Sequence, residues 1–186
     1  MRRKPAIWIC GLVAAVAAVA AIAATPLSAA GEVSREYQVK AAFLYNFVQF
    51  VDWPARAFAS EQEPITIGIV GHDPFQGVLD QIVADKRVNG RELVVRRFQG
   101  AGDLGRCHLL FVGGAEAERA AAVIAKGRAM GALTVGEPEQ FTRAGGVIRL
   151  FTEDNRVRFE VNLDAAEQAQ LKISSKLLKL ARIFKR

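Results

Sequence analysis

The sequence is poor in the residues that build metal centres and disulfide frameworks. Its 186 residues include two cysteines and two histidines. Cys10 lies in an apolar N-terminal run, which leaves Cys107 as the one cysteine beyond it, so we expect no internal disulfide. His72 falls in a predicted turn. His108 adjoins Cys107 in a predicted strand, where neighbouring side chains point to opposite faces and cannot chelate one ion together. We therefore predict no metal site.

The sequence also lacks the motifs of the common enzyme classes. The turn after the first predicted strand, residues 68–73, does not have the G-x-G-x-x-G spacing of dinucleotide-binding folds, and neither G-x-x-x-x-G-K-[ST] nor G-x-S-x-G occurs. No serine stands in a pattern with a supporting histidine. We expect no catalytic residues and no cofactor, and hence a protein that is not an enzyme.

The first 30 residues have the composition of a secretory signal peptide. Three basic residues at positions 2–4 precede an apolar run over residues 6–24, and small residues lie before Gly31. We predict export with cleavage after Ala30, which leaves residues 31–186 as one domain. The run of 19 residues is also long enough to cross a bilayer. An uncleaved N-terminal membrane anchor is therefore the alternative.

The charge balance excludes one class of partner. The leader holds three basic residues and no acidic ones, so its removal lowers the net charge from +6 to +3. An excess this small does not indicate binding to nucleic acid. The content of 51% hydrophobic and 24% charged residues lies in the globular range.

Helical and strand-like segments alternate along residues 31–186. Helical patterns extend from the N-cap Ser34 to Trp53-Pro54, from the N-cap Asp73 over residues 74–83, and over residues 116–126. Apolar runs typical of buried strands occupy residues 65–70, 93–98, 107–112 and 132–135. This alternation predicts a mostly parallel sheet with helices on its faces.

The last third of the sequence has a different pattern. Residues 147–152 and 156–161 flank a turn and read as a hairpin. An amphipathic helix is expected from Asp164 to the end of the chain. The fold class is therefore α/β, a single three-layer domain in which a mostly parallel sheet carries a C-terminal hairpin and helices on both faces.

The expected terminal helix supplies a candidate partner interface. It has more apolar positions than one core-facing stripe needs, so some could contact a partner. The alternative is that all of them belong to the core. The candidate interface residues are Leu163, Ile173, Leu177, Leu180, Ile183 and Phe184.

Turns after three predicted parallel strands form a second candidate site. In an open parallel sheet such turns line the crevice at the carboxyl edge, where ligands bind. The alternative is that their glycines and Asp73 serve the turns alone. The candidate crevice residues are His72, Asp73, Gly113, Gly114 and Glu137.

Six segments in order resemble the YfiR-like family of exported proteins. They are EYQVKAAFLYNF (36–47, followed by Trp53-Pro54), RCHLLFV (106–112), LTVG (133–136), GGVI (145–148), VRFEVN (157–162) and LKISSKLLKLA (171–181). The resemblance implies a periplasmic, non-enzymatic regulator that binds and represses an inner-membrane diguanylate cyclase, with effects on cyclic-di-GMP, biofilm formation and motility. The alternative function is a periplasmic small-ligand binding module that works with a membrane receptor or transporter.

The resemblance also implies partners. They are the inner-membrane cyclase, or another membrane receptor, and an OmpA-like outer-membrane lipoprotein, and a homodimer is left open. Members of the family that respond to redox state carry paired cysteines. Because Cys107 has no second cysteine within residues 31–186, we do not expect intramolecular redox sensing here.

Overall fold

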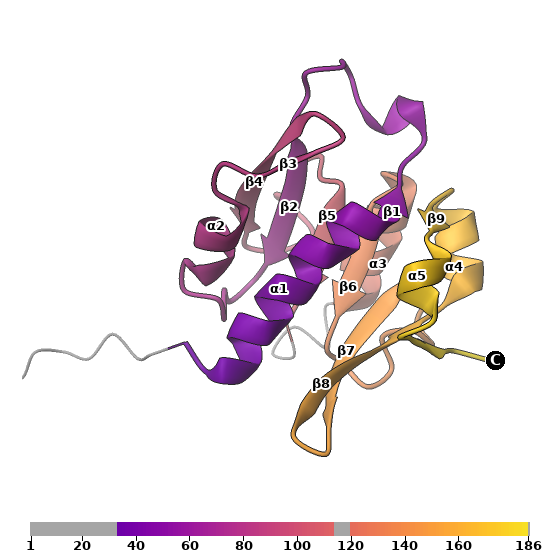
Figure 1. Ribbon diagram of the computed structural model, residues 1–186. Coiled ribbons are helices and arrows are strands. Elements are labelled where there is room, and N and C mark those ends of the chain that lie inside the picture. Colours follow the sequence, from indigo (N-terminus) through magenta and orange to yellow (C-terminus); the bar gives the residue numbers. More distant parts are fainter. Residues whose placement is uncertain (1–32, 114–119, 186) are drawn as a thin grey trace, which may run out of the picture. The chain divides into compact units, whose positions relative to one another are not determined.

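The computed structural model describes residues 33–113 and 120–185 (Figure 1). The predicted signal peptide and Gly114 lie outside these residues. The helices are α1 (Arg35–Phe50), α2 (Val78–Val83), α3 (Ala120–Ala129), α4 (Leu163–Gln168) and α5 (Ser175–Leu178), with a short 3₁₀ turn at Ala55–Ala57. The strands are β1 (Val51–Asp52), β2 (Ile65–Val70), β3 (Arg87–Val88), β4 (Arg91–Phe98), β5 (Leu109–Val112), β6 (Leu133–Gly136), β7 (Ile148–Glu153), β8 (Arg156–Val161), β9 (Lys172–Ile173) and β10 (Arg182–Ile183).

Eight of the described strands form one mixed sheet. Their order is β10-β8-β7-β6-β5-β2-β4-β3, and neighbours from β4 to β7 are parallel. The hairpin partner β8 runs antiparallel to β7. At the opposite edge, β3 and β4 form a second hairpin around Asn89 and Gly90, whose positive φ angles of 51° and 80° suit the tight turn. The predicted α/β fold class is confirmed.

Helices cover both faces of the sheet. Successive strand residues point to opposite faces, so Phe111 packs in the apolar cluster with α1 and α2, whereas Leu110 and Val112 pack in the cluster with α3. Figure 1 shows α1 crossing one face, with α3 behind the sheet. The parallel strands are therefore buried on both sides, as their continuous apolar runs require.

One predicted helix start and one predicted helix end differ from the structure. Ser34 does cap α1, since its Oγ accepts a hydrogen bond from the Tyr37 amide at 3.4 Å. Asp73 does not cap α2, because its carboxylate accepts from the Phe75 amide within a turn and the helix begins only at Val78. The described part of the third helix begins at Ala120 and extends to Ala129, three residues beyond the predicted end.

The single terminal helix predicted from Asp164 is wrong. The helix α4 ends at Gln168, and Gln170 follows with a φ of 56°, while the Leu171 amide donates to the Ala166 carbonyl. This left-handed termination stops a helix. Ser174 then caps the short α5, with its Oγ accepting from the Lys176 amide.

Strand pairing occupies the rest of that segment. The strand β9 pairs antiparallel with β1, the strand that directly follows α1. The strand β10 pairs parallel with β8. The Ser174 amide donates to the Phe50 carbonyl at 2.9 Å and extends the first of these pairings. Tertiary hydrogen bonds therefore replace the continuous helix that the apolar spacing favours.

Candidate functional site

The predicted crevice lies where the sheet changes its winding direction. Strand β2 has β4 on one side and β5 on the other, so the switch point lies between β2 and β5. His72 follows β2 and Gly113 follows β5. A Cβ placed on Gly113 would stand 3.9 Å from both the His72 carbonyl oxygen and Glu137 Oε2. The structure therefore brings His72, Gly113 and Glu137 together.

Asp73 points to a different set of groups. Its Oδ2 lies 2.8 Å from Arg97 Nε, and the same guanidinium lies 2.5 Å from Asp80 Oδ2. Hydrogen bonds to Asp80 and Asp73 raise the pKa of Arg97, although burial opposes them. Asp73 thus ties its turn to β4 and α2. Gly114 lies outside the described residues.

A buried ion cluster occupies the crevice beside Glu137. Lys40 Nζ, from α1, lies 2.5 Å from Glu137 Oε1 and 2.5 Å from Glu36 Oε1. Tyr37 donates its hydroxyl hydrogen to Glu137 Oε2 at 3.4 Å. Lys40 is 4% exposed. Burial lowers the pKa of Lys40, but the hydrogen bonds to Glu137 and Glu36 outweigh it, so that the pKa is raised overall.

This cluster anchors α1 to the carboxyl edge of the sheet. Sequence reasoning missed Lys40 and Tyr37, because they lie almost a hundred residues before Glu137 and look like ordinary positions of an amphipathic helix. In the crevice, Glu137 therefore binds Lys40 and Tyr37 of α1.

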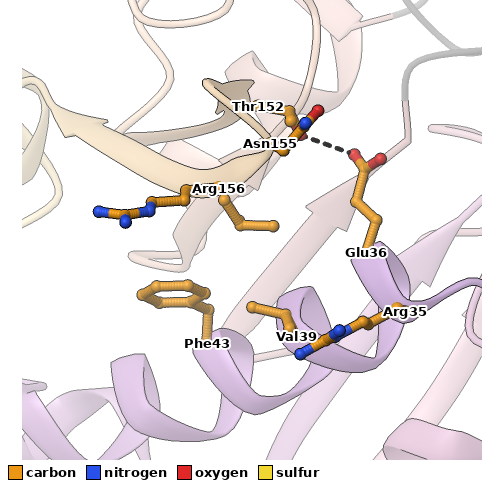
Figure 2. A pocket seen from close by; sticks show the side chains of 8 residues that line it. Arg35, Glu36, Val39, Phe43, Thr152, Asn155 and Arg156 are labelled. Carbon is orange, nitrogen blue, oxygen red and sulfur yellow. Dashed lines mark hydrogen bonds between the residues drawn. The ribbon is translucent and has the colours of Figure 1, made fainter.

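A groove opens between α1 and the tip of the β7–β8 hairpin (Figure 2). Its volume is about 710 Å³, within the size range of small-molecule sites. Its walls are Arg35, Glu36, Val39 and Phe43 from the helix and Thr152, Asn155, Arg156 and Val157 from the hairpin.

The groove combines apolar and cationic groups. Val39, Phe43 and Val157 offer apolar surface, and Val39 is 39% exposed. Glu36 Oε1 accepts a hydrogen bond from the Thr152 hydroxyl at 3.0 Å, which links the two walls. The guanidinium groups of Arg35 and Arg156 can pair with a carboxylate or phosphate. Nothing in the sequence pattern indicated this site, because its two walls are far apart in the chain.

The candidate partner residues fall into three classes of exposure. Leu163, Leu180 and Ile183 are 41%, 75% and 36% exposed, and they are three of the four large apolar side chains exposed in the described residues. Ile173 and Phe184 are half-buried. Leu177 is buried in the core with α1, so its assignment to a contact surface is wrong.

The three exposed residues belong to one edge of the molecule. Ile183 pairs with Val161 in β8, two residues before Leu163, and β10 is the outermost strand on that side of the sheet. Beside it, a groove of about 370 Å³ is lined by Leu163, Ala166, Leu171 and Ile173 among other residues. We call Leu163, Leu180, Ile183 and this groove the C-terminal patch.

The C-terminal patch has a basic border. Residues 171–185 contain no acidic side chain. Their exposed charges are Lys172, Lys176, Lys179, Arg182 and Lys185. Arg182 pairs with Glu153 at 2.8 Å, and the exposed Asp164 and Glu167 lie beside Leu163 and the groove. The basic charge is therefore confined to the side of the patch that residues 171–185 form. An apolar centre with a charged rim is the usual layout of a protein interface.

Comparison with known proteins decides the family. Residues 37–182 match the model of the YfiR/HmsC-like family. The chain belongs to this family. Membership supports the general role of a periplasmic regulatory protein rather than a catalyst. The YfiR/HmsC-like match includes α1 from Tyr37 onward, the β7–β8 hairpin, and Leu163 and Leu180 of the C-terminal patch, and it ends one residue before Ile183.

A solved structure shares the fold at low identity. A conserved domain protein from Vibrio cholerae O1 biovar El Tor aligns with a TM-score of 0.55 and 13% identity over 80% of this chain. This YfiR/HmsC-like chain spans 60% of the length of that protein. The ABC domain from Streptococcus pneumonia in complex with L-Trp aligns at a TM-score of 0.46 and 10% identity, over 64% of this chain and 55% of that one, a likeness too loose to inform function. No curated protein matches the sequence.

Two features are absent from the part of the chain that the structure describes. Within residues 33–113 and 120–185, no cluster of histidine, cysteine or acidic side chains could hold a metal ion. None of the helices in these same residues is long and apolar enough to cross a membrane.

Proposed function

We propose that this YfiR/HmsC-like protein docks through its C-terminal patch on the periplasmic part of an inner-membrane signalling protein, a diguanylate cyclase, and represses it. The observation that supports this proposal is the exposure of three large apolar side chains at or near the edge strand β10: Ile183 on the strand, Leu180 two residues before it, and Leu163 two residues after the strand β8 that pairs with it. Exposed apolar residues that lie together mark interaction sites more often than residues scattered singly. An outermost strand also offers unpaired backbone groups to a partner.

The charges around the patch specify the complementary surface. The exposed lysines of residues 171–185 favour a partner whose contact surface is apolar at its centre and acidic at its border. Such complementarity raises the association rate and discriminates against basic surfaces. The general regulatory role of the family is consistent with a surface that binds another protein.

The test compares three substitutions that each introduce one glutamate. Leu180→Glu changes the most exposed apolar residue of the patch, Leu177→Glu changes a buried neighbour, and Ala121→Glu adds the same charge on the exposed face of α3. Each variant replaces the wild type in a strain deleted for the gene, and intracellular cyclic-di-GMP is measured. A wild-type gene without codons 2–30 controls for the need for export.

The proposal predicts a specific pattern of results. Deletion raises the cyclic-di-GMP level. The exported wild type and Ala121→Glu return it to the level of the undeleted strain. Leu180→Glu is folded and secreted but leaves the level raised. Leu177→Glu fails because it does not fold, which circular dichroism shows. Repression by Leu180→Glu equal to that by Ala121→Glu would remove the C-terminal patch from the mechanism. An unchanged cyclic-di-GMP level on deletion would refute the cyclase as partner.

The groove of Figure 2 supports a second candidate function, that of a small-ligand binding module. Its apolar walls and two arginines suit a molecule with an apolar body and one carboxylate or phosphate group. A ligand that binds only the folded state raises the melting temperature by mass action. We expect such a shift from a panel of aromatic and aliphatic carboxylates with the wild type, and a smaller one with Arg156→Ala. Equal shifts in both proteins would place the binding elsewhere.

A further inference from the structure

The segment that connects β1 to β2 packs on a buried histidine. We call residues 53–63 the strap. His108 is 2% exposed and immediately precedes β5. The Phe58 ring of the strap stacks on the imidazole, with 4.4 Å between ring centroids and an angle of 17° between the planes. Trp53 donates its indole hydrogen to the His108 carbonyl oxygen at 3.0 Å.

Both ring nitrogens of His108 have partners that fix its protonation state. The Thr66 amide of β2 donates to Nδ1 at 3.0 Å, so Nδ1 accepts and bears no proton. Nε2 lies 3.2 Å from the Ala57 carbonyl of the strap, so Nε2 bears the proton and donates it. This arrangement requires the neutral imidazole, in which one nitrogen donates and the other accepts.

Protonation destroys this arrangement. An imidazolium has a hydrogen on each nitrogen, and the new hydrogen on Nδ1 would point at the amide hydrogen of Thr66. That amide belongs to the central strand β2 and cannot turn away, whereas the strap is a loop at the surface. Relief is therefore easiest when the ring, with the strap stacked on it, leaves its position.

The surroundings of His108 also disfavour its charged form. Burial lowers the pKa of His108, the nearby Arg91 and Arg106 lower it further, and Glu63 and the Ala57 carbonyl oppose these effects in part. Arg91 also holds the outer side of the strap. Its guanidinium stacks on Phe58 at 3.8 Å and donates to the Ser60 and Glu63 carbonyls at 2.8 Å each.

We propose that the strap is an acid-operated latch, which the neutral His108 holds closed on the sheet and the protonated His108 releases. The consequence reaches the C-terminal segment. The strap begins directly after β1, and β1 pairs with β9, next to the groove of the C-terminal patch. Opening the strap removes the support on one side of this two-stranded pairing. The latch itself does not depend on the identity of any partner.

Hydrogen exchange measured by mass spectrometry tests the latch on the full-length protein. Exchange in peptides covering the strap is compared at about pH 5 and about pH 7.5, after correction for the intrinsic rate. A histidine that titrates near 6.5 in the open strap and stays neutral in the closed one sets an upper limit of about 30-fold on the increase in opening. We expect several-fold to 30-fold more opening of the strap at the lower pH.

Two variants and one titration make the test specific. His108→Gln cannot titrate and should open to the same extent at both pH values, whereas His72→Gln, which changes the exposed histidine, should behave as the wild type. If His108→Gln does not fold, NMR titration of the two histidines in the wild type replaces it, and the His108 midpoint must coincide with opening of the strap. Equal exchange of the wild-type strap at both pH values would refute the latch. So would a pH-dependent opening that persists in folded His108→Gln.

Discussion

Replacing Lys40 by methionine tests the buried ion cluster that anchors α1 to the sheet. Methionine keeps most of the apolar stem, so the change removes the ammonium group and little packing. Glu137, whose side chain is 10% exposed, then loses the ion pair with Lys40 in a buried site. Removing one partner of a buried ion pair costs about 3–5 kcal/mol. We expect a loss of about 3 kcal/mol in the free energy of unfolding, or roughly 9 °C in Tm for a domain of this size.

The two carboxylates should contribute unequally. The Glu36 side chain is 43% exposed and solvent screens it, so Glu36→Gln should cost less than about 1 kcal/mol. Glu137→Gln should cost about 2 kcal/mol because Lys40 keeps its contact with Glu36. The double variant Lys40→Met with Glu137→Gln should cost at least about 1.5 kcal/mol less than the sum of the single variants, since it removes both charges of the buried pair together.

Urea unfolding followed by circular dichroism gives these values. Equal losses for Glu36→Gln and Glu137→Gln, or additive losses in the double variant, would refute the assignment of Glu137 as the principal partner. The pH dependence offers an independent check. Because the folded pKa of Lys40 is raised above its ordinary value of 10.5, its stabilisation is complete below that pH and is lost as the pH rises through the folded pKa. Lys40→Met should lack this alkaline loss.

Three other substitutions or probes have defined outcomes. Gly136→Ala should cost about 1–3 kcal/mol in chemical denaturation, because its Cβ would stand within 2.3 Å of the buried Phe141 ring. Burial raises the pKa of Cys107 to about 12, so this thiol should react with a thiol-specific reagent at neutral pH only after unfolding, and rapid labelling of the native protein would contradict its burial. Arg97 lowers the pKa of Asp80 through a hydrogen bond, so the wild type should lose a small stabilisation as the pH falls below 3.8, and Asp80→Asn should lack it. Because the carboxylate is exposed, the effect should be less than about 1 kcal/mol. Thermal unfolding at two pH values measures it.

The strands of this protein were predictable from local pattern, whereas the C-terminal segment was not. The run Ile65–Val70 is apolar on both faces and could only be a buried strand. In the last twenty residues the apolar spacing fits a helix, yet a left-handed Gln170 and the pairing of β9 with β1 divide it. That pairing joins residues from opposite ends of the described chain, and no window of sequence contains both partners.

The candidate sites also divide into one that the sequence pattern indicated and one that it did not. The edge exposure of Leu180 and Ile183 follows from an apolar surplus that is visible in the sequence, although the surplus could not distinguish them from the buried Leu177. The groove between α1 and the β7–β8 hairpin could not be predicted, because Phe43 and Arg156 line one pocket only when the helix lies beside the hairpin. Chemistry that depends on residues from distant elements is visible only in the fold.

The pairing of β9 with β1 has a consequence for the order in which the molecule is completed. The helix α1 lies early in the sequence, but the strand that follows it, β1, pairs with residues 172–173 near the end of the described chain. Long-range pairings of this kind are formed late, since the entropy of closing a long loop must be overcome first. In a nascent or partly translocated chain, β1 therefore stays unpaired until residues 172–173 are available. The same residues lead into the edge strand β10 of the C-terminal patch, so a chain that ends before residue 172 would lack both this strand pairing and the edge strand.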